Sequence, residues 1–158
     1  MKTLVLALGN PILTDDGVGL AVARELEGRL AGADVTTATM VGLDLLELVR
    51  GYDRVFLVDA LTTRGGRPGE VHELTPEDGT LHLFSSHGVN FFDLLELGRR
   101  LGEPVPEVAG VYGIEIGEEV AFGHALSPEV EAGVARAVER ICREVGREGG
   151  KAAAPVLS

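Results

Sequence analysis

Long apolar runs alternate along the chain with segments of helical periodicity. Residues 2–8 (KTLVLAL) and 54–61 (RVFLVDAL) are the most continuously apolar stretches. Runs of this length without polar alternation are typical of strands that are buried on both faces of a sheet. Residues 33–40 and 106–117 predict two further strands. The alternating segment at 69–74 (GEVHEL) predicts an edge strand.

Helical periodicity falls between these strands. The predicted helices cover about residues 16–30, 43–52, 90–102 and 127–146. The first has one apolar face, on which the repeating residues are Val18, Val22, Leu26 and Leu30. The third is expected to begin after Asn90 as its N-cap and to bury a face made of Phe91, Leu94, Leu95 and Leu101. In the last, Ser127 is the expected N-cap and Pro128 the first helical residue.

The order of these elements predicts the fold class. Strands that alternate with helices indicate a three-layer α/β fold, in which a mostly parallel twisted sheet is flanked by helices and carries an antiparallel edge strand. The chain has 158 residues and no internal linker or repeat. Residues 1–148 are therefore expected to form a single α/β domain, and residues 149–158 a disordered tail.

Composition excludes several classes of protein. The formal net charge of −11 argues against nucleic acid and anionic membranes as partners, because both require clustered basic residues. No apolar stretch is long enough for a transmembrane helix. Cys142 is the single cysteine, so neither an intramolecular disulfide nor a cysteine-based metal site is expected. We expect a cytoplasmic protein.

Acidic and imidazole side chains follow the predicted strands. Asp15 and Asp16 come soon after the first strand, Asp59 ends the third, and His87 lies in the SSHG segment before a helix. In parallel sheets, ligands bind outside the carboxyl ends of the strands. Two carboxylates and one imidazole would suit a borderline divalent ion such as nickel, zinc or cobalt, and three protein ligands would leave positions open for a substrate.

Each of these residues also has a structural interpretation. Asp15 or Asp16 can cap the first helix; we favour Asp15 as the cap and Asp16 as the site residue, although spacing alone does not separate them. Asp59 can be a polar terminator of its strand, and a lone loop histidine such as His87 is more often solvated than bound to a metal. His124 is the reserve candidate for an imidazole ligand.

Two other residues with chemical potential are expected to be structural. His72 is predicted to point outward from the edge strand and to be exposed, and Cys142 to be a small buried residue of the last helix. The sequence also lacks the glycine patterns of dinucleotide-binding and phosphate-binding loops, and it lacks the elbow motif of serine hydrolases.

Several segments together resemble the hydrogenase maturation endopeptidases. These segments are LGNPILTDDGVG at 8–19, VFLVDAL at 55–61, SSHG at 85–88, GIEIG at 113–117 and FGHALSPEV at 122–130. The resemblance runs from Met1 to about Val145 and implies a twisted sheet flanked by helices. It also implies a metal site formed by Asp16, Asp59 and His87.

The sequence departs from the pattern of that family in two places. Members often have glutamate at the position of Asp16. Many carry an Asp-Gly-Gly-Thr-x-Gly run after the second strand, where this chain has TTATMVG and keeps only Gly42. The resemblance therefore implies a substrate-binding role for Gly42 alone, and it suggests a divergent hydrogenase class or a different target.

The implied activity is proteolytic. Such a protein removes the C-terminal extension of a nickel–iron hydrogenase large-subunit precursor, and nickel already seated in the precursor is the recognition signal. Asp16 is our candidate for the general base, and zinc or cadmium can take the place of nickel in vitro. We expect a monomer whose partner is the precursor. The alternatives are a non-catalytic nickel-binding maturation chaperone and, less favoured, a small-molecule hydrolase.

Overall fold

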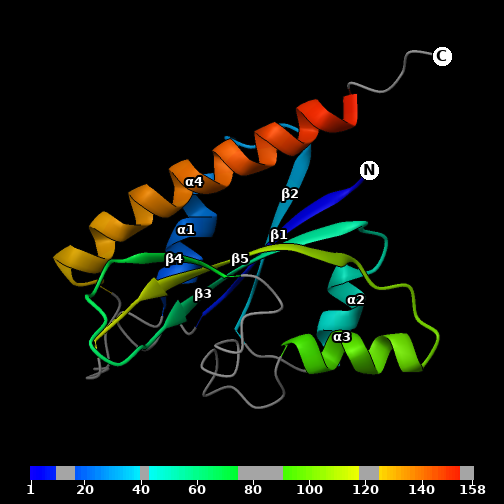
Figure 1. Cartoon of the computed structure of the whole chain (residues 1–158), viewed down its shortest axis with the longest axis horizontal. Helices are drawn as coiled ribbons and strands as arrows, with labels where there is room; N and C mark the ends of the chain where they lie inside the picture. The colour runs from blue at the N-terminus through cyan, green and yellow to red at the C-terminus, as the bar shows by residue number, and fades with distance from the viewer. Residues whose placement is uncertain (10–16, 40–42, 75–90, 118–124, 154–158) are drawn as a thin grey trace.

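The computed structural model describes residues 1–9, 17–39, 43–74, 91–117 and 125–153, with side chains described as far as residue 147. The elements, shown in Figure 1, are β1 (Thr3–Leu8), α1 (Val18–Leu26), β2 (Ala33–Ala38), α2 (Asp44–Val49), β3 (Arg54–Leu61), β4 (Val71–Leu74), α3 (Phe91–Arg100), β5 (Glu107–Glu115) and α4 (Pro128–Ala153).

The strands of the described ranges form one five-stranded sheet in the order β2-β1-β3-β5-β4. Strand β1 runs parallel to β2 and β3, and β3 runs parallel to β5, whereas β4 is antiparallel to β5 at the edge. The predicted fold class, including its antiparallel edge strand, is confirmed. Strand β3 occupies the centre of the sheet, which explains why its sequence is an almost continuous apolar run.

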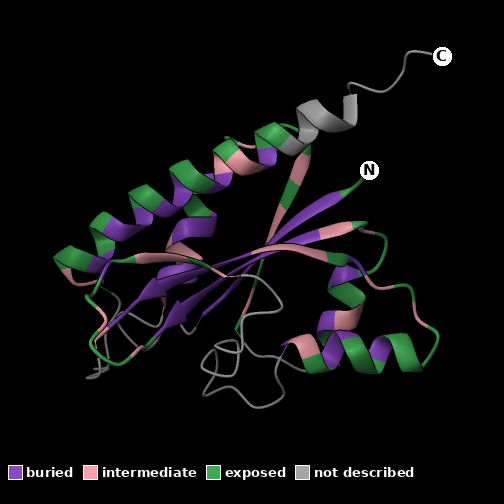
Figure 2. Cartoon of the chain, in the orientation of Figure 1, coloured by how far each residue is buried: buried purple, intermediate pink, exposed green. Residues whose placement is uncertain are grey.

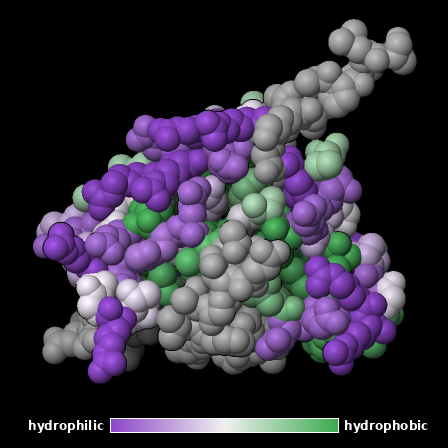
Figure 3. Space-filling view, in the orientation of Figure 1, coloured by the Kyte–Doolittle hydropathy of each residue, from purple (hydrophilic) through white to green (hydrophobic). Residues whose placement is uncertain are grey.

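Helices cover both faces of the sheet, as Figure 1 shows. On one face, α1 and α4 bury Val22 and Ile141 in a core cluster that includes Phe56 of β3. On the other face, α2 and α3 contribute Leu45 and Leu94 to a second cluster. Figure 2 shows the result: buried residues line the sheet and the inward sides of the helices. In Figure 3 the outward side of α4 is hydrophilic.

The first helix is shorter than its apolar repeat predicts. It ends at Leu26 and not at Leu30, because Gly28 takes a left-handed conformation with φ of 78° that turns the chain toward β2. Its N-cap residue is Gly17, and capping by Asp15 stays a prediction. Asp15 itself lies outside the described residues.

The third and fourth helices also differ from expectation at their ends. Leu101 lies beyond the end of α3 at Arg100 and is 66% exposed, so its predicted burial is wrong. Helix α4 continues to Ala153, further than the predicted helix end at residue 146. The lysine and alanines at 151–153 favour helix, which accounts for the extension past two glycines. Residues 154–158 lie outside the described part of the chain.

The contact between α1 and the sheet provides a test of this packing. Gly19 of α1 lies so close to β1 that an added Cβ would overlap the carbonyl oxygen of Leu8 and lie 3.3 Å from that of Val58. We expect Gly19→Ala to lower the free energy of unfolding by about 1–3 kcal/mol. Gly146 of α4 has open space around an added Cβ, and Gly146→Ala should raise the free energy of unfolding by up to about 1 kcal/mol. Urea denaturation measures both; equal effects would contradict the packing described.

Candidate active site

Asp59 lies near the carboxyl end of the central strand and is only 3% exposed. Successive side chains of β3 alternate between the two faces, and Leu57 and Leu61 belong to the core cluster on the α2 and α3 side. Asp59, which lies between them, therefore faces that side. Its Oδ1 atom accepts a hydrogen bond of 2.7 Å from the backbone N–H of Ala60. A buried carboxylate thus lies two residues before the end of the central strand.

His72 shares a row with Asp59 across three strands. Gly113 of β5 pairs with Asp59 of β3 on one side and with His72 of β4 on the other. Residues directly opposite one another in a sheet point to the same face, so both side chains lie on the α2 and α3 side. Gly113 has no side chain to stand between them. The prediction that His72 is exposed is wrong, because its side chain is 31% exposed and turned toward Glu70.

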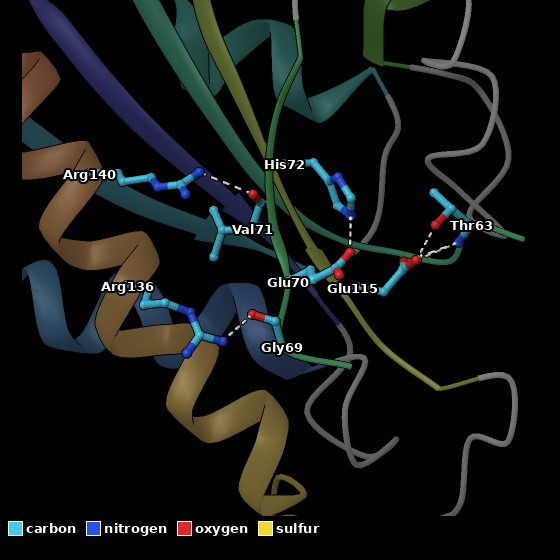
Figure 4. A network of polar contacts seen from close by, with 8 residues as sticks. All are labelled: Thr63, Gly69, Glu70, Val71, His72, Glu115, Arg136 and Arg140. Carbon is cyan, nitrogen blue, oxygen red and sulfur yellow. Dashed lines mark hydrogen bonds and ion pairs between the residues drawn. The ribbon is translucent and has the colours of Figure 1, made fainter. Parts of the chain in front are cut away.

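The surroundings of His72 are acidic. Its Nε2 atom lies 3.7 Å from a carboxylate oxygen of Glu70 (Figure 4). This nitrogen is buried and makes no hydrogen bond with the described residues. Backbone hydrogen bonding places Glu70 opposite Glu115 at the start of β4. His72, Glu70 and Glu115 thus lie at the same edge of the sheet as Asp59.

Glu115, the last residue of β5, is a buried acidic residue that sequence analysis did not single out. Its side chain is fully buried. Its two carboxylate oxygens accept hydrogen bonds of 3.1 and 3.0 Å from the backbone N–H of Thr63, and one of them also accepts from the Thr63 hydroxyl (Figure 4). Gly66 packs so closely on this carboxylate that an added Cβ would overlap it. The sequence feature that could have identified Glu115 is the position of a glutamate inside the otherwise apolar segment GIEIG.

The remaining predicted site residues lie outside the described part of the chain. These are Asp16, Gly42, His87 and the reserve candidate His124. Within the described ranges, no group of three or more histidine, cysteine, aspartate or glutamate side chains is arranged to hold a metal ion. The proposed triad of metal ligands therefore stays a prediction, of which the structure describes Asp59.

Features on the opposite face of the sheet are separate from this site. Tyr112 is buried among the α1 and α4 residues. Burial, and secondarily the charge of Glu73, raises its pKa well above the ordinary value, so the phenol stays protonated. A groove of about 670 Å³ lies between α1 and α4, where the half-buried Cys142 contributes to its wall. Both features lie on the side of the sheet away from Asp59.

Comparisons with known proteins agree on one family. The family described as hydrogenase maturation protease (HycI) matches residues 20–144. The Escherichia coli K12 hydrogenase 2 maturation protease is 29% identical over 161 residues, which cover 98% of this chain and 96% of that protein. Among solved structures, the E. coli hydrogenase maturating endopeptidase HybD superposes with a TM-score of 0.79 at 27% identity, covering 94% of each chain.

A further solved structure has higher sequence identity. The [NiFe] hydrogenase maturation protease HybD from Thermococcus kodakarensis is 31% identical, with a TM-score of 0.73 over 92% of this chain and 99% of that one. The fold is thus that of an α/β peptidase. The chain is a member of the hydrogenase maturation protease family. No helix in the described ranges has the length and hydropathy needed to span a membrane.

The bond between Thr63 and Glu115 can be tested by removing one hydroxyl. Thr63→Val keeps the shape of the side chain but leaves the buried carboxylate with one donor fewer. We expect the free energy of unfolding to fall by about 1.5–3 kcal/mol. Thr37→Val, at an exposed position of β2, is the control and should change it by less than about 0.5 kcal/mol. Chemical denaturation measures both values; an unchanged stability in Thr63→Val would argue against the role of this contact.

Proposed function

We propose that the protein is a metal-dependent endopeptidase that removes the C-terminal extension from the large-subunit precursor of a nickel–iron hydrogenase. Membership of the hydrogenase maturation protease family supports the proteolytic role. The name of the Thermococcus relative, a [NiFe] hydrogenase maturation protease, supports the type of hydrogenase. We expect the protein to act in the cytoplasm and as a monomer.

The observation that carries the proposal is the position of Asp59. Asp59 is 3% exposed and lies near the carboxyl end of the central strand, the edge at which parallel α/β sheets bind their ligands. A carboxylate at this edge is a suitable ligand for a divalent cation brought by the substrate. In this proposal Asp59 is joined by Asp16 from the loop after β1 and by His87 from the segment before α3, and the three side chains bind nickel that the precursor already holds.

The roles of the protein's own groups follow from their chemistry. Nickel in the precursor, as a Lewis acid, would supply polarisation of the scissile carbonyl group. Asp59 and His87 would hold the precursor by its nickel so that the scissile bond lies beside the acidic loop. Asp16 would accept the proton of the attacking water as general base. Gly42, just beyond β2, would allow close approach of the substrate backbone.

A second candidate function is a nickel-binding maturation chaperone without catalytic activity. The TTATMVG stretch favours it, because this stretch keeps only Gly42 of the run that many family members use with the substrate. The two functions differ in one measurement. A chaperone binds the precursor and leaves its mass unchanged, whereas an endopeptidase shortens it.

Processing should require nickel in the precursor. We expect the protein to cleave the nickel-loaded precursor and to leave the nickel-free precursor intact, as measured by mass spectrometry. Asp59→Asn, Asp16→Ala and His87→Ala should each abolish cleavage and weaken nickel binding. Asp34→Asn, an exposed carboxylate on edge strand β2, should cleave normally. Equal cleavage of both forms of the precursor, or full activity in Asp59→Asn, would refute the proposal.

A further inference from the structure

The connection between β3 and β4 consists of two consecutive tight turns. In the first, the N–H of Gly66 donates to the carbonyl of Thr63 at 3.1 Å, and Gly65 has φ of 75°. In the second, the N–H of Glu70 donates to the carbonyl of Arg67 at 3.0 Å, and Gly69 has φ of 93° after a proline. A glycine with positive φ at the third position of each turn fits a type II turn.

Glu115 fastens both turns to the end of β5. Its carboxylate binds the first turn through Thr63. Its backbone binds the second: the N–H donates to the carbonyl of Glu70 and the carbonyl accepts from the N–H of Gly69, each at 2.8 Å. From the other side, Arg136 of α4 donates to the carbonyl of Gly69 at 2.7 Å (Figure 4). The connection is therefore held at both ends and has little freedom to move.

This fixed connection exposes Arg64 and Arg67. Neither forms an ion pair with any described residue. Other exposed arginines do have carboxylate partners: Arg29, Arg50, Arg99, Arg100 and Arg143 each bind a glutamate. The connection joins the carboxyl end of β3 to the start of β4, so the two free guanidinium groups belong to the same edge of the sheet as Asp59.

We propose that Arg64 and Arg67 bind carboxylate groups in the C-terminal segment of the precursor and so help to align that segment with the site at Asp59. This inference rests on the proposed function. The charge of the protein supports it: at −11 overall, the surface repels acidic segments. Carboxylates would therefore be accepted at the two arginines that have no ion pair within the described residues and lie at the same edge of the sheet as Asp59. Guanidinium groups also bind carboxylates in a defined bidentate geometry.

Two double variants, each of which loses two positive charges, test the proposal. Arg64→Gln with Arg67→Gln removes both free charges at the site edge. Arg24→Gln with Arg147→Gln removes the same total charge at exposed positions of α1 and α4 that also lack ion pairs within the described residues. With the nickel-loaded precursor we expect the first pair to raise KM about tenfold with kcat little changed, and the control pair to keep the KM of the unaltered protein.

A second arm changes the substrate. The altered precursor carries amides in place of the carboxylate side chains of its C-terminal segment. Its KM with the unaltered protein should be higher than that of the original precursor. Its KM with the Arg64→Gln, Arg67→Gln variant should change little, because the two changes remove the same contacts. An unchanged KM in that variant, or an equal rise in the control pair, would overturn the inference.

Failure of this inference differs from failure of the proposed function. If the unaltered protein leaves the nickel-loaded precursor uncut, the proposed function fails. The affinity of each variant for the uncut precursor then still tests whether Arg64 and Arg67 bind it. Weaker binding by the Arg64→Gln, Arg67→Gln variant than by the control pair then supports their role. Equal affinities overturn it.

Discussion

The structure depends on the burial of its central strands on both faces. All residues of β1 and nearly all of β3 are buried. An unpaired charge in the middle of such a strand would carry a large desolvation cost, so acidic side chains can be accommodated only where a strand ends and turn backbone supplies donors. Glu115, the last residue of β5, occupies such a position, with Thr63 as its donor. Asp59 lies two residues before the end of β3, and its donor is the N–H of Ala60 in the same strand. The same constraint that stabilises the sheet therefore gathers its chemistry at one edge.

Sequence patterns predicted the features that depend on local burial. The range of β3 and the place of Asp59 follow from one apolar run and its polar end. Alternation in β4 predicts which residues share a face but not which face is covered, so the half-burial of His72 was missed. Glu115 was missed because its partner Thr63 lies 52 positions earlier. The convergence of Asp16 and His87 on Asp59 concerns residues outside the described ranges and stays a prediction.

The arginines of this acidic protein differ in the groups that they contact. Several neutralise glutamates on the exposed faces of helices, as Arg143 does with Glu139. Arg140 of α4 donates to the carbonyl of Val71 (Figure 4), as Arg136 does to that of Gly69. Arg140 thus occupies a backbone acceptor of the edge strand β4, and Arg136 one in the turn just before it, which limits the pairing of this edge with another chain. Arg64 and Arg67, by contrast, are exposed and have no ion pair within the described residues, and their connection starts from the edge of the sheet where Asp59 lies.

A site of two carboxylates and one imidazole has little intrinsic preference between nickel and zinc, since affinities for such donors follow the general order of the divalent metals. In the proposed function, selectivity for a nickel-loaded precursor would therefore need a contact with the polypeptide in addition to the contact with its metal. Two linked contacts of moderate strength reinforce each other, because the first raises the effective concentration of the second. Free zinc would use only the metal contact. The precursor would use both, provided that the second contact is held at a fixed distance from the first. The hydrogen bonds of Glu115 to both turns of the β3–β4 connection favour such a fixed arrangement.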